Sequence, residues 1–128
     1  MGIERVREVM YAPFTIPERD SEGRLVRVDN PEIQFGMIDS GAMVGCVSHA
    51  VLATFPILQQ YFVEKPDHLS GVGSIKCAVF GELRNVPINL GTQQEKGNTA
   101  LVNFRVTEGA GYQVIFGLDY LVGIKAWV

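Results

Sequence analysis

The chain has 128 residues, of which 47% are hydrophobic and 20% are charged, so it is long enough for one domain with its own core. Its formal net charge is −3 and its basic residues are scattered, which argues against a nucleic-acid surface. The apolar stretches fall short of the about 20 residues that a membrane-spanning helix needs, and the first 14 residues lack the apolar centre of a secretory signal. Two cysteines do not make a disulfide framework, which favours a reducing, cytoplasmic location.

Turn-forming segments recur about every 8 to 12 residues along the chain. The expected turns are at 20–23, 29–32, 70–74, 80–83, 95–98 and 107–111. Between them lie short runs with the composition of strands, at 24–28, 32–38, 75–80, 85–90, 100–106, 112–117 and 124–128. This spacing predicts an all-β barrel or sandwich rather than βαβ units.

The first half of the chain is expected to contain an arm, a buried strand and a helix. The first dozen residues are expected to form a loose arm. Residues 33–38, IQFGMI, are almost continuously apolar, which is typical of a central strand covered on both faces. Residues 48–55, SHAVLATF, place their large apolar side chains on one helical face. Ser48 is the expected N-cap, and Pro56 is expected to end the helix.

The second half of the chain is expected to contain a half-buried strand and a helical turn. In TALVNFRV, the apolar residues Val102, Phe104 and Val106 alternate with polar ones, which predicts a strand with one buried face. After the apolar run that ends at Gly117, residues 118–121, LDYL, predict a short helical turn. Together these patterns predict an all-β fold with one or two short helices.

The residue that most needs an explanation is Asp39, which ends an apolar run and is followed by Ser40 and Gly41. A buried carboxylate is unfavourable unless it is paired or used in chemistry. A capping or turn-forming aspartate would explain an isolated Asp-Ser-Gly, because this tripeptide is common. Two further segments follow in the same chain, however: a glycine-rich tip at 70–74 inside an expected hairpin, and an apolar strand that runs into Gly117.

These three segments, in this order, resemble the signatures of the retropepsin family of aspartic proteases, particularly the enzymes of gypsy-type LTR retrotransposons. The signature of two apolar residues and Asp-Thr/Ser-Gly-Ala matches MIDSGA at 37–42. The flap tip matches SGVGS at 70–74, and the late strand, glycine and helix match VIFGLDYL at 114–121. The resemblance covers about residues 24–128. It implies a closed or partly open β-barrel with a flap hairpin, preceded by an N-terminal arm and first strand at 1–23.

The resemblance implies a peptidase in which a water molecule is held between two aspartates. Two carboxylates this close cannot both ionise, so they share a proton; one then activates the water and the other donates to the scissile carbonyl. The chain contains one Asp-Ser-Gly, and the aspartate of the late signature, Asp119, stands where a helix would use a capping acid. The second carboxylate must therefore come from another copy, which predicts a homodimer with both Asp39 residues at its two-fold axis.

The resemblance also implies partners and the roles of further residues. The expected substrate is a peptide or retroelement polyprotein, and we expect no cofactor, metal, nucleic acid or membrane. Asp39 is the expected catalytic acid or base, and its loop is supported by Ser40, Gly41 and Ala42. The flap, which closes on substrate and excludes water, is formed by Gly71, Val72, Gly73 and Ser74. The apolar cleft is shaped by Met43, Val72 and Ile75, and the strand beneath the loop contributes Ile115, Phe116 and Gly117.

Three positions depart from what the resemblance leads us to expect. Many retroviral members have an acidic residue and an arginine where this chain has Met43 and Leu118. Both charged partners are replaced together, so no charge is left unpaired. The replacement nevertheless favours an alternative function: a catalytically inactive or domesticated retropepsin-like dimerisation or binding module. Gly45 predicts an irregular strand after the loop. A third hypothesis, a small β-barrel that binds an apolar ligand, leaves the ordered signatures unexplained.

Overall fold

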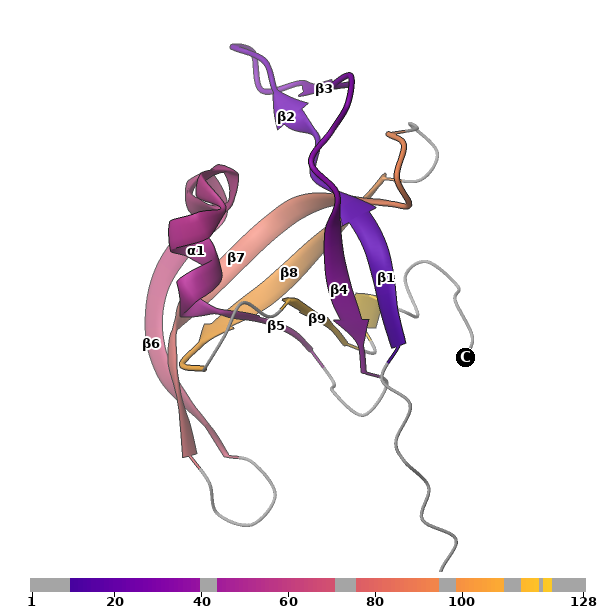
Figure 1. Ribbon diagram of the computed structural model, residues 1–128. Coiled ribbons are helices and arrows are strands. Elements are labelled where there is room, and N and C mark those ends of the chain that lie inside the picture. The colour runs from indigo at the N-terminus through magenta and orange to yellow at the C-terminus, as the bar shows by residue number, and fades with distance from the viewer. Residues whose placement is uncertain are drawn as a thin grey trace, which may run out of the picture.

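A computed structural model of the chain describes residues 10–39, 44–70, 76–94, 99–109, 114–117 and 119–120. Its strands are β1 (Met10–Thr15), β2 (Glu18–Arg19), β3 (Leu25–Val26), β4 (Gln34–Ile38), β5 (Gly45–Ser48), β6 (Phe62–Ser70), β7 (Lys76–Leu90), β8 (Thr99–Thr107) and β9 (Val114–Phe116). Its helices are α1 (His49–Thr54) and the 3₁₀ helix η1 (Pro56–Tyr61). The expected all-β class is therefore confirmed, and Figure 1 shows the strands wrapped around one interior.

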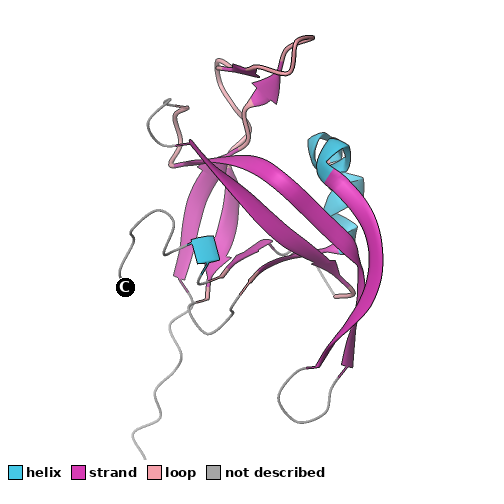
Figure 2. Cartoon of the chain, turned by 180° about the vertical axis from the view of Figure 1, so that it is seen from behind, coloured by secondary structure: helices cyan, strands magenta, loops and turns pink. Residues whose placement is uncertain are grey.

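The main sheet has the strand order β1–β4–β9–β5–β8–β7–β6. β1 also pairs with β7, through Phe14 opposite Leu90 and Thr15 opposite Asn89. This second pairing joins β1 to β7, so the strands from β1 to β7 in this order form a closed ring, and β6 pairs with β7 outside it (Figures 1 and 2). No helix among the described residues is both long enough and apolar enough to cross a bilayer.

The core is centred on the ring of Phe116, which is completely buried. Its centroid lies 5.2 Å from that of Phe14 in an edge-to-face contact, 5.9 Å from that of Phe104, and 4.6 Å from that of Tyr120 in a stacked contact. Such geometries add to the stabilisation that aromatic rings gain from burial. The three rings around Phe116 belong to β1, β8 and the segment after β9, so this one side chain joins distant parts of the chain.

Two local predictions agree with the structure. In β8 the expected alternation is present, since Val102, Phe104 and Val106 are buried and Asn103 is exposed. The expected helix is α1, with Ser48 at its N-cap position and its Val51 and Leu52 side chains buried. Ser48 makes no side-chain capping hydrogen bond there. Packing of the apolar face therefore stabilises this short helix, as expected for a helix of this length.

The turn expected at 80–83 is wrong, because β7 runs from Lys76 to Leu90 as one strand. Gly81 in this segment serves close packing instead. A Cβ atom at Gly81 would lie 2.2 Å from the carbonyl oxygen of Val63 on β6. The register of β7 with β8 shifts between Leu83 and Val86. Asn85 lies within this irregularity, has a positive φ of 55°, and donates its N–H to the side chain of Asn103. A bulge of this kind bends a strand without ending it.

The structure also corrects the expected cover of β4. Phe35 is 64% exposed, so the strand is not covered on both faces. Its other face lies against the core, where Gly36 is buried beneath the ring of Phe116. The apolar composition of β4 therefore reflects one buried face and one exposed apolar face, on which Phe35 pairs with Pro13 of β1.

The last residues of the segment expected to be a loose arm belong to the main sheet instead. β1 begins at Met10, whose pairing partner on β4 is Ile38. Residues 10–12 therefore belong to the main sheet, because they complete its hydrogen bonding beside β4. Residues 1–9 and the strand expected at 124–128 lie outside the described residues. The expected division of the chain near residue 24 stays a prediction.

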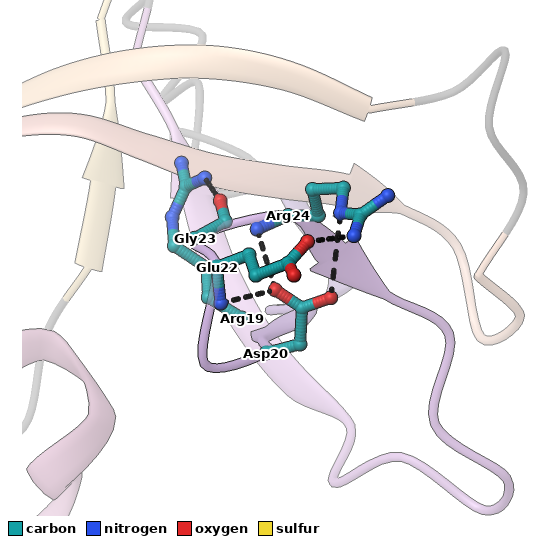
Figure 3. A network of polar contacts seen from close by, with 5 residues as sticks. All are labelled: Arg19, Asp20, Glu22, Gly23 and Arg24. Carbon is teal, nitrogen blue, oxygen red and sulfur yellow. Dashed lines mark hydrogen bonds and ion pairs between the residues drawn. The ribbon is translucent and has the colours of Figure 1, made fainter.

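The ribbon of β2 and β3 projects from one end of the main sheet (Figure 1). Its turn was expected at 20–23, and the structure confirms it. Asp20 accepts hydrogen bonds from the N–H groups of Glu22 and Arg24, both at 2.9 Å, and its carboxylate also pairs with the Arg24 guanidinium (Figure 3). Gly23 has a φ of +80°, a conformation that glycine adopts at no steric cost.

Candidate active site

Asp39 directly follows β4 and is half-buried. β4 runs parallel to β9, with Met37 opposite Ile115 and Ile38 opposite Phe116. The N–H of Asp39 donates to the carbonyl oxygen of Phe116 at 3.1 Å. This bond extends the ladder one residue past the end of β4, so the backbone of Asp39 is fixed at the point where the 39–44 loop leaves the sheet.

The two strands that flank this loop hold the same third strand between them. β9 is parallel to β4 and antiparallel to β5, where Ile115 lies opposite Cys46 and Val114 opposite Val47. Both ends of the loop are thus tied to β9, although β9 follows β5 by more than sixty residues along the chain. The segment expected beneath the loop, Ile115 and Phe116, forms this strand. Its supporting role in catalysis stays a prediction.

Glycines allow the three strands to approach one another this closely. A Cβ atom at Gly117 would lie 2.6 Å from the carbonyl carbon of Val44 and 2.8 Å from the nitrogen of Gly45. A Cβ atom at Gly36 would lie 2.2 Å from the ring of Phe116. Contacts this short do not occur for real side chains, so each position requires a residue without a Cβ atom.

The expected irregularity at Gly45 is not present. β5 starts at Gly45 and pairs in unbroken register with β8, from Gly45 opposite Phe104 to Ser48 opposite Thr107. A Cβ atom at Gly45 would lie 3.0 Å from the carbonyl oxygen of Ile115 and 2.9 Å from the ring of Phe104. Glycine at this position therefore makes room for β9 and Phe104 instead of disturbing the strand.

We expect Gly117→Ala to lower the free energy of unfolding by about 1–3 kcal/mol, the usual cost of overpacking. The loss should fall at the upper end of this range, because the new methyl group meets backbone atoms of Val44 and Gly45 that cannot rotate away. Gly109→Ala is the matched control, since a Cβ atom there lies 3.5 Å from that of Ser48. Urea unfolding of both variants tests the prediction, and equal losses would contradict it.

Much of the predicted site lies outside the described residues. This applies to Ser40, Gly41, Ala42, Met43, Gly71, Val72, Gly73, Ser74, Ile75 and Leu118, whose roles stay predictions. The flanks of the expected flap are described: β6 and β7 form an antiparallel hairpin in which Ser70 lies opposite Lys76. Figures 1 and 2 show the end of this hairpin on the same side of the molecule as the carboxyl end of β4, which Asp39 follows.

The other aspartate of the signatures lies in a helical segment and makes a local hydrogen bond. Asp119 is exposed, and its carboxylate accepts a hydrogen bond from the N–H of Tyr120 at 2.9 Å. Residues 119–120 are helical, so this bond satisfies a backbone donor within a helical segment, and the expected capping role stays a prediction. Within the described ranges, no three His, Cys, Asp or Glu side chains gather as metal ligands.

Sequence reasoning did not anticipate that Tyr120 belongs to the core. The side chain is 4% exposed and stacks on Phe116. Among the described residues its hydroxyl has no hydrogen-bond partner, and burial raises the pKa of Tyr120. The available signal was weak, since a tyrosine in LDYL fits a surface turn equally well.

We expect Tyr120→Phe to keep or slightly raise stability at neutral pH, because it removes a buried hydroxyl that lacks a described partner. Since the folded state raises the pKa of Tyr120, the wild type should hold its stability below about pH 10, the ordinary pKa of tyrosine, and lose it as the pH rises further. The variant should lose less. Urea unfolding across this alkaline range tests the prediction, with Tyr11→Phe at an exposed side chain as control. Identical alkaline slopes in wild type and Tyr120→Phe would contradict it.

Comparison with known proteins identifies the fold. No protein-family model and no curated protein sequence matches the chain. Among solved structures, the crystal structure of the retroviral protease-like domain of Ddi1 from Leishmania major matches with a TM-score of 0.60. The chain has a retropepsin-like fold. The match covers 91% of this chain and 78% of that one at 21% sequence identity, so it bears on the fold alone. The predicted architecture is confirmed, whereas a closer relationship to gypsy-type enzymes stays a prediction.

Proposed function

We propose that this chain is an aspartic endopeptidase that works as a homodimer, with Asp39 of each copy forming the catalytic pair. The observation that carries the proposal is the position of Asp39 on a retropepsin-like fold. It follows β4 directly, and its N–H is held by the carbonyl oxygen of Phe116. A fixed backbone at this point limits the positions that the carboxylate can take. General acid–base chemistry requires such a positioned carboxylate.

The proposed reaction is hydrolysis of a peptide bond by a water molecule held between the two carboxylates. One proton is shared by the pair, because two ionised carboxylates at this distance repel each other strongly. The ionised carboxylate takes a proton from the water, and the protonated one donates to the scissile carbonyl. The β6–β7 hairpin would carry the flap that closes over the substrate. We propose a retroelement polyprotein, cut between apolar residues, as the substrate.

A second candidate function is a retropepsin-like dimerisation or binding module without catalysis. The observation that favours it is the joint replacement of the charged pair of retroviral members by Met43 and Leu118. Against it stands the intact Asp-Ser-Gly-Ala at 39–42, since a module without catalysis gains nothing from a pair of closely placed carboxylates.

Digestion of a random peptide mixture, from mildly acidic to neutral pH, with and without pepstatin, tests the proposal. We expect cleavage that pepstatin blocks, and the cut sites should report the preferences of the apolar cleft. Sedimentation of the same sample measures whether the chain is dimeric. A protein that is dimeric but cuts no peptide would refute the peptidase and favour the binding module.

A further inference from the structure

A cavity of about 620 Å³ lies at the end of the barrel beside the β2–β3 ribbon. It is lined by Pro17, Leu25, Val26, Arg27, Asn89, Gln94 and Thr99. Figure 1 shows the ribbon at the opposite end of β4 from the strand's carboxyl end, which Asp39 follows. The cavity is therefore separate from the candidate active site, and its volume falls within the range of about 300–1,000 Å³ that is typical of small-molecule sites.

Part of the cavity wall is apolar, and its Leu25 and Val26 belong to a ribbon with a fixed shape. Leu25 and Val26 are each 41% exposed, which leaves apolar surface open at the mouth. The neighbouring turn is held by the Asp20 carboxylate, which accepts from two backbone N–H groups and pairs with Arg24 (Figure 3). Exposed apolar side chains on a well-braced element are a feature of binding surfaces.

Gln94, which borders the cavity, carries a buried side-chain amide. It is 5% exposed, and its Oε1 accepts a hydrogen bond from the N–H of Val28 at 2.8 Å. A backbone N–H can only donate, so this bond fixes which end of the amide faces Val28. The Nε2 group is buried and has no acceptor among the described residues. A buried donor without an acceptor is unfavourable, and an acceptor on a bound molecule would remove that penalty.

The charges around Gln94 determine which kind of acceptor fits. Arg27 lines the large cavity, is exposed, and forms no ion pair with any described residue. Gln94 also borders a second cavity of about 230 Å³, which is lined by Glu18 and Glu32. An anion would be repelled from that second cavity and attracted to the side of Arg27.

We propose that the cavity beside the β2–β3 ribbon binds an amphipathic monocarboxylate. The apolar tail packs on Leu25, Val26 and Pro17, Arg27 provides the counter-charge at the mouth, and a shift of the atoms that cover Nε2 of Gln94 lets this group donate to the carboxylate. This site is independent of the proposed peptidase, so Asp39→Asn should bind the ligand as the wild type does.

Titration of the ¹⁵N-labelled protein with sodium octanoate, and separately with 1-octanol, tests the site. We expect octanoate to shift the side-chain amide signal of Gln94. Gln94→Glu keeps an oxygen for the N–H of Val28 but replaces the donor with a negative charge, so octanoate should bind about tenfold more weakly or not at all. Binding of 1-octanol, whose hydroxyl can also donate, should remain.

Arg27→Met provides a second test that does not alter the interior. It should weaken octanoate binding about two- to fivefold, while Arg24→Met, whose partners lie in the turn, should leave binding unchanged. The absence of any octanoate shift, which would indicate a cavity that holds only water, would overturn the proposal. Equal octanoate affinity in the wild type, Gln94→Glu and Arg27→Met would overturn it as well.

Discussion

The Asp39→Asn protein is expected to lose about a hundred- to ten-thousandfold of the peptidase activity. The asparagine has nearly the same shape as aspartate, and the N–H of residue 39 can still donate to Phe116. The fold should therefore be retained while the carboxylate that activates water and shares the proton is lost. Initial rates on the best peptide of the mixture, measured beside urea unfolding of both proteins, separate the loss of chemistry from a loss of folding.

A mixing experiment extends this prediction to the dimer. If each active site takes one Asp39 from each copy, excess Asp39→Asn protein should capture wild-type subunits and suppress their activity. Asp119→Asn is the matched control, because Asp119 is exposed and its carboxylate accepts a local hydrogen bond from the N–H of Tyr120; the variant should neither lose activity nor suppress it. Full activity in Asp39→Asn, or wild-type activity that excess variant leaves unchanged, would contradict the shared site.

Phe116→Ala is expected to lower the free energy of unfolding by about 3–5 kcal/mol, as for other buried phenylalanines. The ring is completely buried and contacts the rings of Phe14, Phe104 and Tyr120. Its removal leaves a cavity at the meeting point of three segments, over Gly36, which carries no side chain to fill the space. Urea unfolding measures the loss. If the slope of the unfolding free energy against urea concentration is the same as in the wild type, the variant still unfolds from a compact state.

Phe35→Ala is the control for this prediction. Phe35 belongs to the neighbouring strand and has the same side chain, but it is 64% exposed. Truncation there should change stability by no more than about 0.5 kcal/mol, as for most surface substitutions. Similar losses in the two variants would contradict the central position that the structure gives to Phe116.

Several features of the fold could be predicted from the sequence because each depends on neighbouring residues. The alternation of Val102, Phe104 and Val106 predicts the half-buried strand β8, and the apolar spacing before Pro56 predicts helix α1. Asp39 could be singled out because it ends an apolar run before Ser-Gly. A buried carboxylate there is unfavourable unless it is paired or used in chemistry. The resemblance to retropepsins, drawn from three ordered segments, predicted the architecture that the structure confirms.

The tertiary structure alone decided where glycine and exposed apolar residues belong. The sequence predicts a turn around Gly81, yet this glycine lets β7 pass close to the carbonyl oxygen of Val63. The sequence predicts that Phe35 is part of the core, yet its side chain lies on the exposed face of β4. Periodicity reports which residues alternate along a strand, but it does not report which neighbour covers each face.

The same limit applies to the surroundings of Asp39 and of the ribbon cavity. The bond from Asp39 to Phe116 joins residues far apart in the chain, and so does the approach of Gly117 to Val44. The amide of Gln94 is held by Val28 across a comparable separation. The sequence by itself determined the strands and the aspartate that ends one of them. Only the folded chain decided the partners of these residues, because long-range pairing depends on how all the strands pack together and leaves no periodic pattern in any one segment.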